Sequence, residues 1–164
     1  MNKNPVTAKD VFDLLEGTWQ GEGQGGYPTI EPFDYRETLV FTRKNDSTLA
    51  YDQRTEKRMD GTDEYLPSHW ENGFISILEN GDLELVNAQS GSRGEVLTGH
   101  IEVIGPIIRL YFVSKALIND VRMVSTARRF ELDGDQLRYE MEMSTTKIDK
   151  LNQHLAITLE RVRK

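Results

Sequence analysis

The stretch QLRYEMEM, residues 136–143, alternates apolar and polar side chains with a period of two. The apolar side chains fall on one side of an extended chain: Leu137, Tyr139, Met141 and Met143. Such alternation is typical of a β-strand with one face in a protein core and the other in water. The stretch therefore predicts a half-buried strand.

The same alternation recurs along the chain, for example in TLAYDQRTE, residues 48–56. Turn pairs such as Asp60-Gly61 and Asn80-Gly81 separate the runs and favour tight hairpins, so neighbouring runs should pair antiparallel. One helical turn or two is expected over residues 10–16, DVFDLLE. The predicted strands, about ten in number, are 17–25, 34–43, 47–58, 67–79, 82–90, 93–103, 106–114, 121–132, 136–146 and 154–163.

A meander of about ten strands must bury its apolar face, either in a sandwich or in a closed barrel. Closure is favoured because the hairpins are sequential and no long crossover connection is evident. A barrel of more than about eight strands is too wide for its own side chains to fill, so it tends to hold a ligand. We therefore predict a single all-β domain over residues 1–164, an antiparallel up-and-down β-barrel of about ten strands with a short N-terminal helical turn.

Residues 17–30, GTWQGEGQGGYPTI, are unusually rich in glycine for a strand. Gly17, Trp19, Gly21 and Gly23 share one face. Glycines let a strand bend sharply and let another backbone approach, while a tryptophan can plug the end of a barrel. A phosphate-binding loop is excluded because no strand precedes the stretch and no helix follows it. The stretch predicts a barrel corner.

The composition excludes several classes of partner and of metal site. The chain has 164 residues, a net charge of -7, no cysteine and three histidines. The acidic balance argues against nucleic-acid partners and against anionic membrane surfaces, and no run reaches the roughly 18 apolar residues of a spanning helix. The absence of cysteine excludes disulfides, thiolate metal ligands and covalently attached haem. Since no secretory signal is visible at the N-terminus, we expect a cytoplasmic protein.

Several short motifs occur together: GTWQGEG at 17–23, YPTI at 27–30, HWENGF at 69–74, AQSG at 88–91, and MSTT at 143–146 before LNQHL at 151–155. In this combination, over about residues 12–162, the chain resembles the nitrobindin family, β-barrel haem proteins similar in outline to lipocalins and fatty-acid-binding proteins. The resemblance implies a ten-stranded barrel that holds noncovalent haem b, with His154 as the axial iron ligand. It also implies nitric oxide binding and the isomerisation of peroxynitrite to nitrate at ferric iron.

The segment around His154 leaves its own structure open. HLAITLERV, residues 154–162, alternates as a final strand that would place His154 with Ala156 and Thr158, opposite Leu155 and Ile157. An amphipathic helix from 151 to 162 fits the apolar spacing nearly as well, although closure of the barrel favours the strand. Gln153 stands where the family usually has proline, which leaves the position of the preceding loop open.

The resemblance adds four further candidate cofactor-binding residues. His69 matches a cavity-lining histidine, with a hydrogen-bonded rim residue as the alternative. Gln89 and Thr29 match positions near the pocket, with strand-end and turn hydrogen bonding as their alternatives. Arg122 is a candidate partner for the haem propionates, in place of a lysine of some relatives. His100 matches no motif and is expected at the surface.

Two other functions compete with a haem protein. A haem-free carrier of a fatty acid or another small apolar ligand would use the same barrel, but it normally needs an inward arginine for the carboxylate, and the sequence assigns none. A hydrolase or zinc enzyme has less support, because no nucleophile motif and no pair of histidines at ligand spacing occurs.

Overall fold

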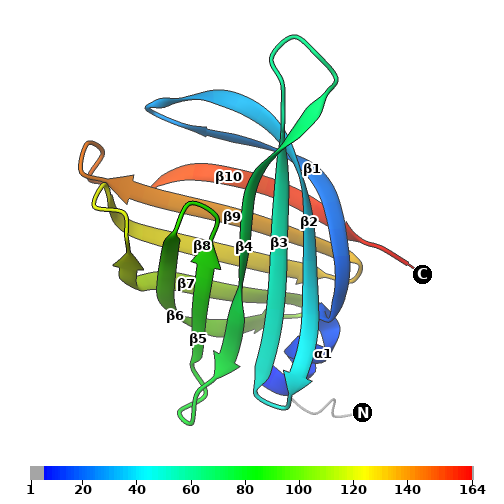
Figure 1. The fold of residues 1–164 in the computed structure, drawn as a ribbon. Helices are drawn as coiled ribbons and strands as arrows, with labels where there is room; N and C mark the ends of the chain where they lie inside the picture. Colours follow the sequence, from blue (N-terminus) through cyan, green and yellow to red (C-terminus); the bar gives the residue numbers. More distant parts are fainter. Residues whose placement is uncertain (1–5, 164) are drawn as a thin grey trace.

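Ten antiparallel strands pair in chain order and close into a barrel where β1 meets β10 (Figure 1). The structure, a computed structural model, describes residues 6–163. The elements are α1 Ala8–Leu15, β1 Gly17–Tyr27, β2 Ile30–Asn45, β3 Thr48–Arg58, β4 Tyr65–Ile77, β5 Leu83–Gln89, β6 Arg93–Ile104, β7 Ile107–Ile118, β8 Met123–Asp133, β9 Gln136–Thr145 and β10 Asn152–Arg161. The predicted fold class is confirmed, and the C-terminal segment is a strand rather than a helix.

Helix α1 closes one end of the barrel. Thr7 caps the helix in a reciprocal pair of hydrogen bonds with Asp10, and Val11, Phe12 and Leu15 are buried in the core of the barrel. The buried indole of Trp19 donates a hydrogen bond of 2.9 Å to the carbonyl of Leu15, the last residue of α1. The guanidinium of Arg161 lies 4.1 Å from the centre of the Trp19 ring. Trp19 is therefore the plug that the sequence predicts.

The glycines of β1 allow close contact with β10. A Cβ atom on Gly21 would lie 2.2 Å from the carbonyl oxygen of Thr158, and one on Gly23 would lie 2.5 Å from that of Ala156. Both distances are too short for any side chain, so only glycine lets the two strands meet at this seam. The seam closes the barrel and carries the C-terminal strand into place.

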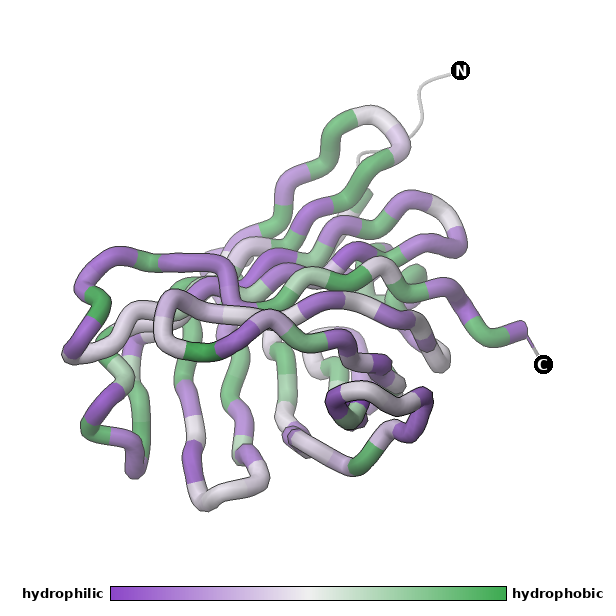
Figure 2. Tube along the Cα trace, turned by 90° about the horizontal axis from the view of Figure 1, so that it is seen from above, coloured by the Kyte–Doolittle hydropathy of each residue, from purple (hydrophilic) through white to green (hydrophobic). Residues whose placement is uncertain are grey.

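The alternating pattern places apolar side chains inside, and the two colours of Figure 2 alternate along the strands accordingly. The core fills the half of the barrel next to α1 and includes Trp19, Leu39, Phe41, Phe112, Phe130 and Leu137. The dry face of QLRYEMEM lies inside as predicted, with Leu137 and Tyr139 fully buried. The core ends at the level of Tyr139, and a cavity occupies the other half of the barrel.

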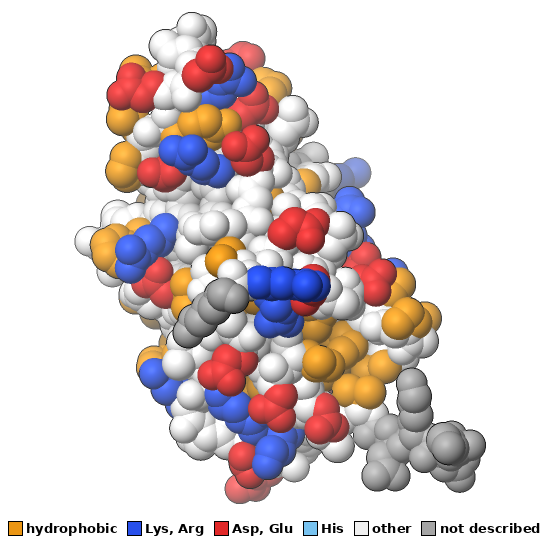
Figure 3. Space-filling view, turned by 90° about the vertical axis from the view of Figure 1, so that its right-hand side faces the viewer, with side chains coloured by type: hydrophobic (Ala, Val, Ile, Leu, Met, Phe, Trp, Pro, Cys, Tyr) orange, Lys and Arg blue, Asp and Glu red, His pale blue; other side chains and the backbone are white. Residues whose placement is uncertain are grey.

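The outer surface mixes charges of both signs. The face shown in Figure 3 interleaves basic and acidic side chains without a patch of one sign. Many of these side chains are paired, as in the 2.7 Å contact between Arg36 Nε and Glu56 Oε2. Among residues 6–163, no helix has the length and apolar character needed to cross a membrane.

Candidate functional site

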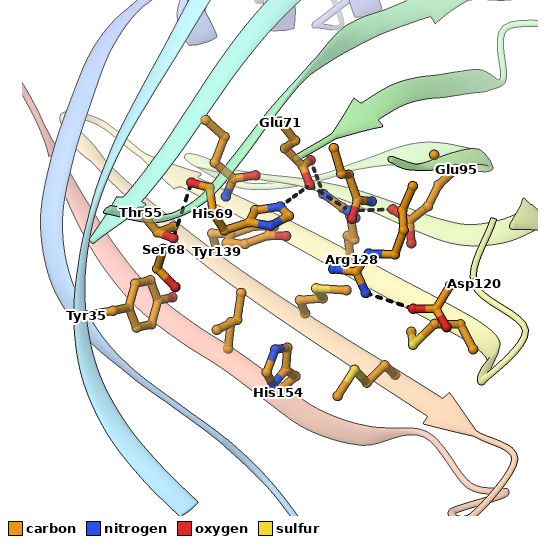
Figure 4. A pocket seen from close by; sticks show the side chains of 18 of the residues that line it. Tyr35, Thr55, Ser68, His69, Glu71, Glu95, Asp120, Arg128, Tyr139 and His154 are labelled. Carbon is orange, nitrogen blue, oxygen red and sulfur yellow. Dashed lines mark hydrogen bonds and ion pairs between the residues drawn. The ribbon is translucent and has the colours of Figure 1, made fainter. Parts of the chain in front are cut away.

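A cavity of about 350 Å³ occupies the open half of the barrel and has two chemically different sides (Figure 4). Its volume lies within the range of small-molecule and cofactor sites. The apolar side includes Phe33, Met123, Met141, Met143 and Leu155. The polar side includes Gln53, Glu71, Glu95, Arg128 and Tyr139. His154 and His69 also line the cavity.

His154 reaches the cavity because both strands at the closing seam are irregular at the same level. The register of β10 against β9 shifts between Gln153 and Leu155, and that of β1 against β2 shifts between Gly25 and Tyr27. A bulge of this kind re-aims a side chain that strict alternation would send outward. His154 therefore lines the cavity together with Leu155, and the expected placement of these two residues on opposite faces is wrong.

The hydrogen bond of His154 defines the state of its ring. Nδ1 lies 3.0 Å from the carbonyl oxygen of Gly26, which can only accept, so Nδ1 carries the proton and Nε2 keeps its lone pair. Burial is the main cause that lowers the pKa of His154, and the charges of His69 and Arg93 lower it further. The rings of Tyr27 and Phe33 pack edge-on against the imidazole, each at 6.3 Å between centroids. This is the arrangement of a metal-ligating histidine with a fixed tautomer.

A fully buried ionic cluster forms the polar side of the cavity. Arg128 Nη1 donates to Glu71 Oε1 at 2.6 Å, and Arg128 Nη2 donates to Glu71 Oε2 at 3.2 Å and to Glu95. The hydroxyl of Tyr51 donates to Glu71 Oε1 at 2.7 Å. Burial alone would raise the pKa of Glu71, but Arg128 and the hydrogen bonds outweigh it and lower the pKa to about 2. Glu71 is therefore ionised at neutral pH.

A second buried carboxyl group, Glu37, has no such partner. Glu37 Oε1 accepts a hydrogen bond of 2.8 Å from Gln53 Nε2, while Glu37 Oε2 and the nearby Tyr35 hydroxyl have no hydrogen-bond partner in the described part of the chain. Burial is the main cause that raises the pKa of Glu37 to about 8. This side chain is therefore a neutral carboxylic acid at neutral pH.

His69 lies between the cavity and the ionic cluster. Its ring is partly exposed, and its Nε2 lies 3.2 Å from Glu71 Oε2. The hydroxyl of Thr55 donates to the backbone carbonyl of His69 at 3.5 Å, across the pair of strands β3 and β4. His69 therefore lines the cavity, and its ring is hydrogen-bonded to Glu71 on its own strand rather than to a neighbouring strand, while its contact with a cofactor stays a prediction.

The remaining candidates divide into two groups. Gln89 lines the cavity, and its Nε2 donates to Asn87 Oδ1 at 3.2 Å. Thr29 is exposed in the turn between β1 and β2 and does not line the cavity. Arg122 is also outside it: the side chain is 77% exposed and donates to Asp120. The structure thus brings His154, His69 and Gln89 together and leaves Thr29 and Arg122 apart.

Besides Arg128, two further cations that the sequence analysis did not single out line the cavity. Lys57 Nζ lies 4.9 Å from the centre of the Phe33 ring, and Arg93 Nη1 lies 3.1 Å from Asp120 Oδ2. Both side chains line the cavity, Lys57 on β3 and Arg93 on β6. His100, in contrast, is exposed and stacks on Tyr111 with 5.2 Å between ring centroids, so its expected surface position is confirmed.

The apolar side of the cavity offers a single imidazole, that of His154, rather than a cluster of ligands. Among residues 6–163, no group of three or more histidine, aspartate or glutamate side chains is placed to hold a metal ion. A single neutral imidazole beside apolar side chains suits a metal that brings its other ligands with it, as the iron of haem does. The donor set therefore fits a haem group and not a protein-ligated zinc ion.

Comparisons with known proteins agree with this geometry. The family model described as the THAP4-like, heme-binding beta-barrel domain matches residues 10–161. Peroxynitrite isomerase 1 of Mycolicibacterium paratuberculosis is 39% identical over 152 residues, and peroxynitrite isomerase 2 of Mycobacterium avium is 38% identical over 152 residues; each match covers 91% of both chains. The crystal structure of Rv2717c from M. tuberculosis matches with a TM-score of 0.83 at 30% identity, covering 99% of this chain and 100% of that chain. The chain therefore belongs to the THAP4-like, heme-binding β-barrel domain family, which confirms the resemblance to the nitrobindin family that its motifs indicate.

Proposed function

We propose that this protein binds haem b noncovalently through His154 Nε2, binds nitric oxide, and isomerises peroxynitrite to nitrate at the ferric iron. The observation that carries the proposal is the fixed tautomer of His154, whose Nδ1 is held by the Gly26 carbonyl while the ring lines the cavity. The names of relatives at 33–39% identity support the reaction class. The haem would supply an iron with one open coordination position, and the chain's own residues hold, orient and shield it.

The lining of the cavity suits the two parts of such a cofactor. Phe33, Met141 and Leu155 offer apolar contact to a porphyrin beside His154. Lys57 and Arg93 offer positive charge for the two propionates, and Arg93 suits a carboxylate because its guanidinium is a planar fork of donors. The buried polar side, with Arg128 and Glu71, sets the polarity of the space left for a small ligand.

Arg128, the one inward and fully buried arginine among the described residues, does not offer a carrier a free site for a carboxylate. Arg128 is an inward arginine of the kind that a carrier needs for a carboxylate, although the sequence analysis did not assign it. Its two terminal nitrogens are already bonded to Glu71 and Glu95, so the cluster carries more negative than positive charge. A fatty-acid carboxylate placed there would be repelled rather than bound.

Titration with hemin under visible spectroscopy tests the proposed function. We expect one haem per chain and a five-coordinate, high-spin ferric spectrum, because His154 offers its lone pair beside the apolar side chains of the cavity, while the ring of His69 is held by Glu71 on the polar side. A low-spin, six-coordinate spectrum would mean that a second side chain, such as His69, closes the open position. A protein that stays colourless with hemin would favour the carrier.

The propionate assignment gives a separate prediction. We expect Arg93→Ala and Lys57→Ala each to weaken hemin binding by a factor of roughly 1.4 to 5, since partly exposed ion pairs contribute about 0.2–1 kcal/mol. Hemin dimethyl ester, which lacks the propionate charges, is the control ligand and should bind the variants and the wild type equally. If Arg122→Ala weakens hemin binding and Arg93→Ala does not, Arg122 rather than Arg93 binds the propionate.

A further inference from the structure

A continuous set of side chains links His69 to the buried ionic cluster. His69 Nε2 faces Glu71 Oε2, and Glu71 is held in turn by Arg128 (Figure 4). We propose that Glu71 and Arg128 are positioning residues that keep the proton of His69 on Nε2, so that Nδ1 receives a proton from small weak acids that enter the cavity. This inference rests on the proposed function, because the conjugate anion of the acid would bind the haem iron.

Glu71 is fixed by several donors at once. Its Oε1 accepts from Arg128 Nη1, from the Tyr51 hydroxyl and, at 3.4 Å, from Asn87 Nδ2. Its Oε2 accepts from Arg128 Nη2 at 3.2 Å. The carboxyl is 3% exposed and cannot turn away without leaving these donors unpaired. Glu71 is therefore a fixed acceptor on the wall of the cavity.

A fixed, ionised acceptor decides the tautomer of its histidine neighbour. A carboxylate has no proton to donate, so the imidazole must donate its own from Nε2. The remaining nitrogen, Nδ1, keeps the lone pair on a ring that lines the cavity. The same logic orients the base in a Ser-His-Asp triad, where a carboxylate holds one nitrogen and frees the other.

The charges around His69 come from every side of the cavity. Glu71 lies on its own strand, Lys57 on β3, and Arg93 and Glu95 on β6. Arg128 lies on β8, Asp120 follows β7, and His154 lies on β10. Glu71 is the one charged group among the described residues that contacts the ring within hydrogen-bond distance. When Nδ1 gains a proton, the positive charge of the ring is thus stabilised mainly by Glu71.

The step balances with a weak acid HX alone. The H–X bond breaks, the proton moves to His69 Nδ1, and X⁻ keeps both electrons of the bond. A haem held by His154 would supply the Lewis-acidic iron that accepts such an anion. No oxidant or reductant is consumed. The ligand class is therefore small acids such as hydroperoxides, peroxynitrous acid or hydrazoic acid, taken up as an anion with the proton retained next to it. Nitric oxide, which carries no proton, lies outside this class.

The tautomer can be measured without haem. In the haem-free protein, we expect the ¹⁵N chemical shifts of His69 to report the Nε2–H tautomer. In Glu71→Gln, the amide carbonyl stays with Tyr51 and Arg128 Nη1, and Arg128 Nη2 keeps its bond to Glu95 in place of the one to Oε2. The amide NH₂ then faces His69 and reverses the tautomer to Nδ1–H. Glu95→Gln is the matched control, because it removes the same charge from Arg128 but does not touch His69.

The consequence for ligands is measured with azide on the haem-loaded protein. At a fixed pH near neutral, azide binding should take up more protons in the wild type and in Glu95→Gln than in Glu71→Gln. Nitric oxide binding should take up none in any of them. An unchanged tautomer or unchanged proton uptake in Glu71→Gln overturns the inference, and so does an equal loss in Glu95→Gln, which would assign the effect to net charge. If no variant binds haem, the proposed function fails, while the haem-free tautomer still tests the positioning of His69.

Discussion

We expect His154→Ala to fold into the same barrel and to lose at least about 100-fold of the affinity for hemin, since loss of an outer-shell partner alone costs roughly 10–100-fold. The imidazole of His154 is the nitrogen ligand that lies among the apolar side chains of the cavity, where Phe33 and Leu155 also stand. The fold should survive because residue 154 lies at a bulge near the start of β10, away from the core at the α1 end. The measurement is a hemin titration followed at the sharp haem absorption band, together with circular dichroism.

Two further variants separate ligation from cavity shape. His69→Leu changes the other cavity-lining histidine and should keep haem while altering the rates of ligand binding and of peroxynitrite decay. In His154→Gly, added imidazole should restore the spectrum, because it can occupy the space of the missing ring. If His154→Ala binds hemin with unchanged spectrum and affinity, the ligand assignment is wrong and the carrier becomes the better account of the barrel.

The fold follows from the sequence because a period of two and sequential turn pairs leave few arrangements for a chain of this length. In the alternating run TLAYDQRTE, the side chains of Leu49, Tyr51, Gln53 and Thr55 share one face and are buried inside the barrel, although two of them are polar. The glycines of β1 and Trp19 also take their predicted roles, since close backbone contact admits no Cβ and the open barrel end needs a large side chain.

The orientation of His154 did not follow from periodicity. A bulge adds one residue to a strand, and its position depends on pairing with both neighbours rather than on local sequence. Only the family resemblance placed His154 at the site. Gly26, whose carbonyl fixes the ring, lies 128 residues away in sequence and carries no local signal.

The buried ionic cluster was missed, although the sequence carries a signal for it. Arg128 shares a face with the apolar Phe130 and Leu132, so alternation alone places a charge inside the barrel. Glu71 likewise lies on the inward face of its strand, with Gly73 two residues later on the same face. What the sequence lacks is the pairing: β4 and β8 are far apart in the chain, and only closure of the barrel brings a carboxylate to the guanidinium.

Glu37 gives the protein a stability that should fall as the pH rises. The folded pKa of about 8 lies above the ordinary value of 4.5, so the folded state holds a proton that the unfolded state releases. The contribution is complete below pH 4.5 and is lost as the pH rises toward about 8. Each pH unit in this interval removes about 1.4 kcal/mol. From pH 4.5 to neutral pH, the wild type should therefore lose on the order of 3 kcal/mol that Glu37→Gln keeps.

Urea unfolding at a series of pH values measures this difference. Gln is the neutral isostere of the protonated acid, so it keeps the contact with Gln53 and removes the titration. Glu71→Gln is the matched control with the opposite sign: its folded pKa of about 2 confines its pH-dependent difference from the wild type to pH values below 4.5. Infrared spectroscopy adds a direct readout, because a protonated carboxyl band near neutral pH should be present in the wild type and absent from Glu37→Gln. A difference between Glu37→Gln and the wild type that stays constant from pH 4.5 to about 8 would show that Glu37 is ionised inside the barrel.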